Sequence, residues 1–215
     1  MILSRRGLAV FALAALAGGL AGLPCPAAMA DDAIAALVAK PVAFPDMALG
    51  SDKAPITIYE YSSLTCPHCA AFAQNVFPML RSKYIDTGKV RFVSREFPLD
   101  LKAAAAALLA RCIAKGDASK FFDATMMIFQ QQEELMAHTT ETLTAIGGKF
   151  GMKQADVEAC VKDDASLDKL QSDQTFAYDH LKVGATPTFF INGEVSKGSM
   201  SFEEMESKLT PLLKK

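Results

Sequence analysis

The sequence lacks any run of basic residues and any large excess of one charge. Its 215 residues include 22 Lys and Arg against 24 Asp and Glu, a formal net charge of −2. This balance argues against nucleic-acid binding, which generally needs a basic patch. Cysteine is scarce, with 5 residues, so the chain is not a disulfide-dense small protein. Its hydrophobic share of 51% and charged share of 21% exclude a disordered chain and a collagen-like fibre.

The first thirty residues are expected to form a signal peptide that is removed on export. Arg5 and Arg6 precede an apolar stretch at 8–23, and Ala28-Met29-Ala30 has the form of a cleavage site. Glycines inside the stretch and prolines after it make a retained membrane-spanning helix the minority interpretation. We therefore expect a mature chain that starts near Asp31 and lies in the periplasm.

The route of export stays open between the general secretory and the twin-arginine pathways. Ser4-Arg5-Arg6-Gly7-Leu8 only partly resembles a twin-arginine signal. Cys25 could suggest a lipoprotein, but Gly22 and Pro24 stand where a lipobox needs a leucine and a small residue other than proline. Cys25 is therefore expected to be discarded with the signal.

A βαβ unit is predicted in the first half of the mature chain. β-Branched and aromatic residues at 56–61 indicate a strand, and apolar residues at helical spacing indicate a helix over 66–84. Pro78 interrupts this helix and should kink it. A second strand is predicted at 90–95. A strand, helix and strand at this spacing imply a parallel pair of strands.

The next eighty residues carry almost no strand signal and are expected to form a helical bundle of their own. Its amphipathic segments are 103–112, 119–136, 141–150, 154–161 and 167–182. The remaining expected elements are a helix at 33–39, an edge strand at 42–44, a hairpin of strands at 188–191 and 194–197 that turns at Asn192-Gly193, and a last helix at 201–213. No internal repeat is visible.

The strongest chemical signal is Cys66-Pro67-His68-Cys69, between a predicted strand and the start of a predicted helix. Unpaired backbone amides and the positive end of the helix dipole favour a thiolate on the first cysteine. Pro67 suits the first helical turn, because its missing N–H would have no partner there. His68 adds a hydrogen-bond donor beside the thiolate. Because a stabilised thiolate favours the reduced form, the disulfide becomes a stronger oxidant.

Half of a zinc site is the alternative for this motif. A structural zinc site would need two further ligands. Cys112 and Cys160 stand alone in separate predicted helices, and the sequence has no second Cys-x-x-Cys. The position of the motif in a βαβ unit favours redox chemistry, so neither a metal nor a cofactor is expected.

A second signal is Thr186-Pro187, at the start of the returning strand. The residue before a proline tends to be extended, and this peptide bond could be cis. Alone the inference is weak, because most prolines at strand starts are trans and only structural.

Both motifs, in this order and separated by predicted helices, resemble the DsbA-like exported thiol:disulfide oxidoreductases of the thioredoxin superfamily. The matching segments are Ile58-Tyr59-Glu60-Tyr61, Cys66-Pro67-His68-Cys69, Phe97-Pro98-Leu99, the run from Thr186 to Gly193, and Gly198. The resemblance implies an α/β protein, a thioredoxin fold with an inserted all-helical domain. On that basis we expect a thioredoxin domain at 31–99 and 183–215 and an inserted helical domain at 100–182.

The resemblance also implies roles for single residues. Cys66 would attack and Cys69 would resolve. A cis Pro187, with Thr186 alongside, would lie against the pair and line the peptide-binding groove. In this family an acidic residue six positions before the first cysteine is a proton relay, and Glu60 occupies that position.

The residues around Glu60 allow two interpretations. Glu60 shares a strand face with Ile56 and Ile58, so burial beneath the dithiol would raise its pKa and let it exchange protons with Cys69. The alternative is a buried acid paired with Arg91 or Arg95 on the neighbouring strand.

Four cysteines in the mature chain allow three pairings, and proximity fixes only the pair Cys66 and Cys69. In a cytosolic protein Cys112 and Cys160 would be buried free thiols. After export we expect a structural disulfide that joins two helices of the insert, worth roughly 3–4 kcal/mol in the entropy model. Some alphaproteobacterial members of the resembling family have such a second pair, so it hints at that sub-branch.

We therefore expect an exported oxidase that donates the Cys66–Cys69 disulfide to reduced, cysteine-containing exported proteins. The resemblance implies reoxidation by a DsbB-like membrane quinone reductase. The main alternative is a disulfide isomerase or reductase, whose N-terminal oligomerisation segment would have to fit in residues 31–50. That segment is short for the purpose, so a monomer is expected. A non-enzymatic periplasmic holdase is the other alternative.

Overall fold

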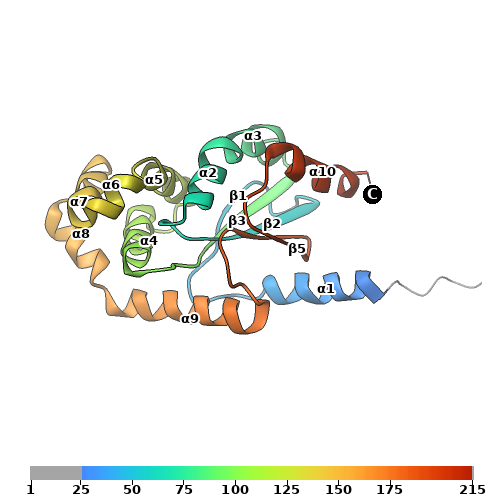
Figure 1. Ribbon diagram of the computed structural model, residues 1–215, viewed down its shortest axis with the longest axis horizontal. Helices are drawn as coiled ribbons and strands as arrows, with labels where there is room; N and C mark the ends of the chain where they lie inside the picture. Colours follow the sequence, from blue (N-terminus) through green and yellow to red (C-terminus); the bar gives the residue numbers. More distant parts are fainter. Residues whose placement is uncertain (1–25, 215) are drawn as a thin grey trace, which may run out of the picture.

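The structure, a computed structural model, describes residues 26–214 and consists of a five-stranded sheet with helices around it (Figure 1). The strands are β1 (Met47–Leu49), β2 (Ile56–Ser62), β3 (Val90–Glu96), β4 (Thr188–Ile191) and β5 (Glu194–Lys197). The helices are α1 (Pro26–Val38), α2 (Pro67–Asn75), α3 (Phe77–Leu80), the π-helical η1 (Arg81–Ile85), α4 (Leu101–Ala114), α5 (Ala118–Gln130), α6 (Gln132–Ala137), α7 (Thr139–Lys149), α8 (Gln154–Val161), α9 (Asp164–Leu181) and α10 (Phe202–Leu212).

The sheet has the strand order β1-β3-β2-β4-β5. β2 and β3 pair in parallel, with Glu60 opposite Ser94, so the predicted βαβ unit is confirmed. β4 runs antiparallel to β2 and places Thr188 opposite Tyr61. β4 and β5 form the predicted hairpin, with Asn192 at a φ of +47° in its turn. The end of β2 is therefore flanked by the end of β3 and the start of β4.

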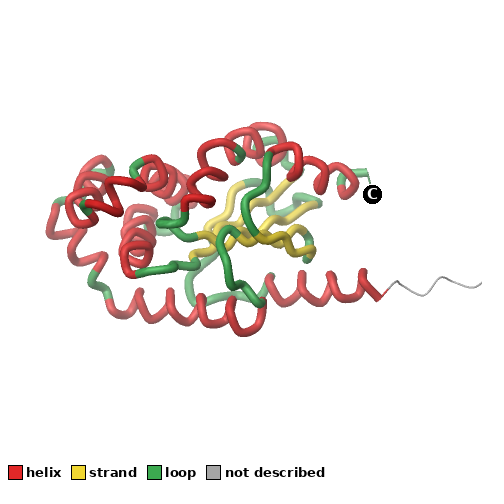
Figure 2. Tube along the Cα trace, viewed as in Figure 1, coloured by secondary structure: helices red, strands yellow, loops and turns green. Residues whose placement is uncertain are grey.

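The two faces of the sheet are covered by different helices (Figure 2). Alternation along β2 sends Ile56, Ile58 and Glu60 to one face, and the apolar residues there pack with residues of α2 and α10. Tyr59 and Tyr61 point to the other face, where they pack with residues of α1 and α9. Burial on both faces makes the sheet the rigid base of the molecule.

The predicted helix over 66–84 is interrupted near Pro78, as the sequence indicated. α2 ends at Asn75, and Pro78 is the second residue of the short helix α3. A proline ring clashes with the carbonyl four residues earlier, so its effect is felt in the preceding turn. The break accordingly lies at Val76, where φ is −110°. The chain then continues through η1 toward β3.

Six helices, α4 to α9, occupy the whole interval between β3 and β4. The predicted helix over 119–136 is wrong in one respect, because it is two helices that meet at Gln131. The backbone there leaves the helical region, with φ −112° and ψ 26°. No proline or glycine marks this position in the sequence. The bend is therefore set by tertiary packing and not by local propensity.

The predicted edge strand at 42–44 is also wrong. The edge strand β1 lies a few residues later and runs antiparallel to β3, with Met47 opposite Ser94. The backbone N–H groups of Ala43 and Phe44 donate to the carboxylate of Asp173 on α9, at 2.6 and 2.9 Å. These amides cannot also form a ladder with a strand. A long-range side chain thus overrides the local strand propensity.

Residues 1–25 lie outside the described residues, and with them the predicted signal's arginines, its apolar stretch and Cys25. α1 starts at Pro26, earlier than the helix expected at 33–39, and runs through the predicted cleavage motif at 28–30. Within residues 26–214, no helix is long and apolar enough to cross a membrane.

Candidate active site

Cys66 occupies the N-cap position of α2, in the loop that follows β2. Its backbone is extended, with φ −81° and ψ 121°, and Pro67 is the first helical residue. The carbonyl of Cys66 accepts the first intrahelical hydrogen bond, from the N–H of Ala70 at 3.1 Å. Cys66 therefore lies at the positive end of the α2 dipole, where a negative charge on its sulfur is stabilised.

The start of β4 brings Thr186 against this cysteine. The peptide bond between Thr186 and Pro187 is cis. The Sγ of Cys66 donates to the carbonyl oxygen of Thr186 at a distance of 3.3 Å. The three residues are buried, although 120 positions separate Cys66 from Thr186. The fold thus brings together the two motifs that stood out in the sequence.

The two cysteines of the motif differ in their access to solvent. Both are free thiols in this structure. Cys66 keeps 6% of its surface exposed, whereas Cys69 is completely buried. Pro67 and His68 are exposed on the surface beside them. An incoming thiol can therefore meet Cys66 more readily than Cys69.

Glu60 is the acidic side chain buried beneath the dithiol, and burial raises its pKa to about 8. The alternative of an ion pair with Arg91 or Arg95 is wrong for the described residues. Arg95 instead donates to both carboxylate oxygens of Asp46, at 2.7 and 3.0 Å, and to the hydroxyl of Tyr61 at 2.9 Å. Without a cationic partner, Glu60 keeps its proton at neutral pH.

Cys69 is affected by the same burial. Burial raises the pKa of the Cys69 thiol far above its usual range, and Glu60 raises it further when its carboxyl group is ionised. A hydrogen bond from the Ser62 hydroxyl would lower the pKa of both Glu60 and Cys69. In the geometry observed, that hydroxyl forms no hydrogen bond within the described part of the chain, so it does not offset the burial. A thiolate on Cys69 would therefore take up a proton readily.

A small cavity of about 40 Å³ reaches Glu60 from the side of α5. Phe72, Phe122 and other apolar side chains form most of its wall, while Glu60, Ser62 and Ser94 contribute polar atoms. A volume of this size has room for about three water molecules. Water there would give the carboxyl group a path for proton exchange. In the residues that the structure describes, no group of three His, Cys, Asp or Glu side chains could hold a metal ion.

The sequence and the fold both have clear relatives. The thioredoxin family model matches residues 43–210. A protein of Rickettsia felis, provisionally named a protein-disulfide oxidoreductase, is 37% identical over 170 residues, which are 78% of this chain and 60% of that protein. Disulfide bond formation protein D of Bacillus subtilis is 26% identical, over 77% of this chain and 76% of that protein. The crystal structure of alpha-DsbA1 from Wolbachia pipientis gives a TM-score of 0.75 at 30% identity, covering 82% of this chain and 94% of that one.

The chain belongs to the DsbA-like branch of the thioredoxin family. The thioredoxin fold expected from the sequence is confirmed by the same matches. The relatives from Rickettsia and Wolbachia agree with the alphaproteobacterial sub-branch. The chain spans between 54 and 60% of the length of the Rickettsia relatives that it matches.

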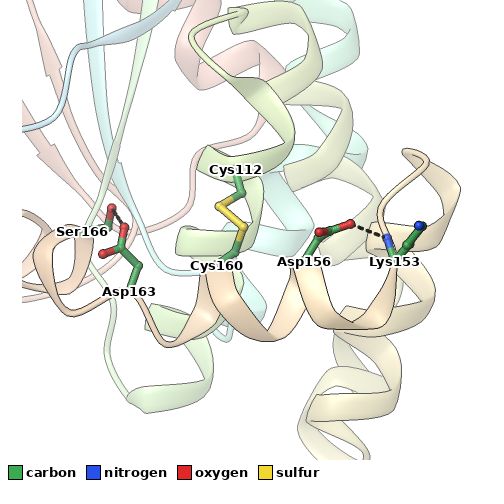
Figure 3. Close-up of a disulfide and its surroundings, with 6 residues drawn as sticks. All are labelled: Cys112, Lys153, Asp156, Cys160, Asp163 and Ser166. Carbon is green, nitrogen blue, oxygen red and sulfur yellow. Dashed lines mark hydrogen bonds between the residues drawn. A yellow bond between two sulfur atoms is a disulfide. The ribbon is translucent and has the colours of Figure 1, made fainter.

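This DsbA-like protein has its second pair of cysteines in the helical region. Figure 3 shows the disulfide between Cys112 on α4 and Cys160 on α8, with the sulfur atoms 2.07 Å apart. At the start of α8, the Asp156 carboxylate accepts a hydrogen bond from the backbone N–H of Lys153 at 3.0 Å and so caps the helix that carries Cys160. Cys112 and Cys160 are bonded to each other, whereas Cys66 and Cys69 are free thiols, so the two cysteine pairs are distinct.

Removing the second disulfide is expected to lower the free energy of unfolding. The bond closes a loop between residues 48 positions apart. In the chain-entropy model such a loop is worth about 4 kcal/mol, because the unfolded chain loses conformational freedom. Urea denaturation of the Cys112→Ala/Cys160→Ala variant should show this loss. Thiol counting is the control: the denatured, unreduced Cys66→Ala/Cys69→Ala variant of the mature chain should have no free thiol, and two free thiols would refute the bridge.

Sequence reasoning missed two polar groups of the DsbA-like site. Ser62 follows Glu60 by two positions on β2, so strand alternation alone places both on one face. Ser94 is the neighbour of Glu60 across the β2–β3 ladder. The predicted parallel pairing did not specify a register, so the sequence had no signal for this second contact.

Proposed function

We propose that this DsbA-like protein is an exported thiol:disulfide oxidoreductase that donates the Cys66–Cys69 disulfide to newly exported proteins. The observation that carries the proposal is the position of Cys66. Its sulfur lies at the N-terminal end of α2 and 3.3 Å from the Thr186 carbonyl oxygen, while Cys69 is buried behind it. The start of α2 favours a thiolate on Cys66, burial disfavours one on Cys69, and the Thr186 carbonyl holds the Cys66 sulfur in place while it is protonated. The difference between the two cysteines is what a disulfide donor needs.

The first step is the attack of a substrate thiolate on the Sγ of Cys66. A bond forms between the substrate sulfur and Cys66 as the bond between Cys66 and Cys69 breaks, and Cys69 leaves with the electron pair. Glu60 then gives its proton to the Cys69 thiolate. The transfer is favourable because the pKa of Cys69 is raised well above the value of about 8 for Glu60.

The second step releases the substrate. Its second thiolate attacks the substrate sulfur of the mixed disulfide, and Cys66 leaves as a thiolate stabilised at the start of α2. The substrate has lost two electrons to form its disulfide, and the protein now carries the reduced pair. The backbone beside Pro187 would pair with the substrate strand during both steps, as in β-strand addition.

The proposal also covers the compartment, the oligomeric state, the reoxidising partner and the domain division of the protein. We place the mature protein in the periplasm as a monomer, reoxidised by a DsbB-like membrane quinone reductase. A thioredoxin domain at 31–99 and 183–215 would carry the cysteines, and an inserted helical domain at 100–182 would lie beside them. The helices that fill the interval between β3 and β4 support this division.

The reduction potential of the Cys66–Cys69 pair is the direct test. Mature protein is equilibrated against glutathione buffers, and the reduced fraction is read by alkylation and mass spectrometry. A disulfide donor is expected to have a potential of about −120 to −180 mV, because its thiolate form is stabilised. A value near −270 mV would indicate a reductase and contradict the proposal. A stable dimer or trimer in size-exclusion chromatography would favour the isomerase instead.

A further inference from the structure

Gln132 connects the helical region to the loop that carries Cys66. It is the first residue of α6, directly after the bend at Gln131. Its side-chain Nε2 donates to the carbonyl oxygen of Leu64 at 2.9 Å and to that of Cys66 at 3.1 Å. One amide group from a distant helix thus holds the backbone on both sides of Thr65.

Two other glutamine side chains also join a helix of the region between β3 and β4 to a segment outside its helices, but neither contacts the loop before Cys66. Gln74 on α2 donates to the carbonyl oxygen of Phe129 on α5 at 3.0 Å. Gln174 on α9 donates to the carbonyl oxygen of Pro98 at 2.7 Å. Gln74 and Gln174 therefore show what a purely connecting glutamine does here. Gln132 differs because one of its acceptors belongs to the proposed attacking residue itself.

The two carbonyl oxygens that accept from Gln132 differ in whether they have another hydrogen-bond donor. The Cys66 carbonyl also accepts the N–H of Ala70, so it would keep one partner without Gln132. For the Leu64 carbonyl, the described residues provide no other hydrogen bond, and Leu64 is buried. Loss of the Gln132 amide would leave this carbonyl unpaired and free the loop to move. The sulfur of Cys66 would then be held less firmly against Thr186.

We propose that Gln132 is a positioning residue for Cys66, through which the helical region sets the reactivity of the attacking thiol. The proposal rests on the function proposed above, in which Cys66 is the attacking residue. The N–H end of the amide dipole points at the loop and favours negative charge nearby. A negatively charged side chain at position 132 would instead disfavour a thiolate on Cys66.

The test compares three variants of the mature protein with the wild type. Gln132→Met keeps the size of the side chain and removes both donors. Gln132→Glu keeps the shape and introduces a negative charge. Gln74→Met is the matched control, because it removes a connecting hydrogen bond of the same kind without touching the loop. For each protein, the rate of iodoacetamide alkylation of Cys66 is followed against pH by mass spectrometry, and the equilibrium with glutathione is measured.

Gln132→Glu is expected to move the midpoint of the alkylation profile upward by about one pH unit and to make the disulfide about tenfold less oxidising, as a charge a few ångströms from the thiolate would. Gln132→Met should move the midpoint of the alkylation profile upward by about half a pH unit and make the disulfide about threefold less oxidising. These are the effects of losing a neutral hydrogen bond. Gln74→Met should leave both unchanged while lowering the stability to urea.

Variants of Gln132 that behave like Gln74→Met would overturn the inference and leave Gln132 as a connecting residue only. If Gln132→Glu fails to fold, Gln132→Met decides the question alone. A wild-type protein whose Cys66 is no more reactive than an ordinary thiol at neutral pH would instead contradict the proposed function, whatever the variants do. The two failures are therefore distinguishable.

Discussion

Cys69→Ala is expected to accumulate covalent complexes with exported proteins, whereas Cys66→Ala is expected to accumulate none. In the first variant Cys66 keeps its position at the start of α2 and its contact with Thr186. Its Cys66 thiolate attacks a disulfide of an exported protein and one sulfur of that disulfide leaves as a thiolate. The mixed disulfide formed at Cys66 persists because Cys69 is absent and cannot displace the bound protein. In the second variant the remaining thiol is fully buried, and burial keeps it protonated.

The complexes are seen on non-reducing gels of periplasmic extracts and should disappear on reduction. Cys112→Ala/Cys160→Ala is the matched control, because it also removes cysteines but should leave no trapped complex. Equal trapping by Cys66→Ala and Cys69→Ala would contradict the assignment of the attacking residue. A separate in vivo complementation test with Cys66→Ser addresses the holdase alternative, since a holdase would keep its function in that variant.

Glu60→Gln is expected to make the protein more stable, by an amount that grows with pH. The pKa of Glu60 rises from 4.5 to about 8 on folding. Between these values the native state binds more protons than the unfolded state, so the wild type loses stability as the pH rises. The loss is about 1.4 kcal/mol per pH unit and reaches roughly 5 kcal/mol at pH 8. A glutamine does not titrate and avoids this loss.

Urea denaturation of both proteins, with the active-site cysteines reduced, gives the difference in unfolding free energy at each pH. The difference should be near zero at pH 4.5 and level off above pH 8. Glu134→Gln, which changes an exposed carboxylate on α6, is the control and should show no such trend. A difference that stays flat from pH 5 to 8 would mean that Glu60 is ionised in the native protein.

The parts of the fold that the sequence predicted well depend on local patterns. The strand at 188–191 and the helix at 154–161 have the predicted bounds, because clear turn and capping residues flank them. The Cys-x-x-Cys motif is recognisable for the same reason, since four consecutive residues carry its chemistry. The Thr186-Pro187 signal was weak alone and gained its meaning from the order of the two motifs.

The parts that the sequence did not predict depend on contacts between distant residues. The carboxylate of Asp173 takes the amides that would have formed a strand at 42–44, from 130 positions away. The bend at Gln131 has no breaking residue, yet it places Gln132 against the Cys66 loop. Periodicity and propensity describe one segment at a time, so neither can show such a pairing.

The strand that completes the site, β4, lies far along the chain from Cys66 and Cys69, so it is synthesised long after them. β4 pairs with β2 across a separation that runs from 127 positions at Tyr61–Thr188 to 133 at Ile58–Ile191, and the contact of Cys66 with Thr186 spans 120. If the chain is exported unfolded and N-terminus first, as one route of the proposed export requires, Cys66 and Cys69 are exposed before β4 exists, and Cys112 follows while both are still uncovered. Closing so long a loop is slow. On that route this protein would itself be a reduced, multi-cysteine client, at risk of the wrong pairings that it is proposed to prevent in others.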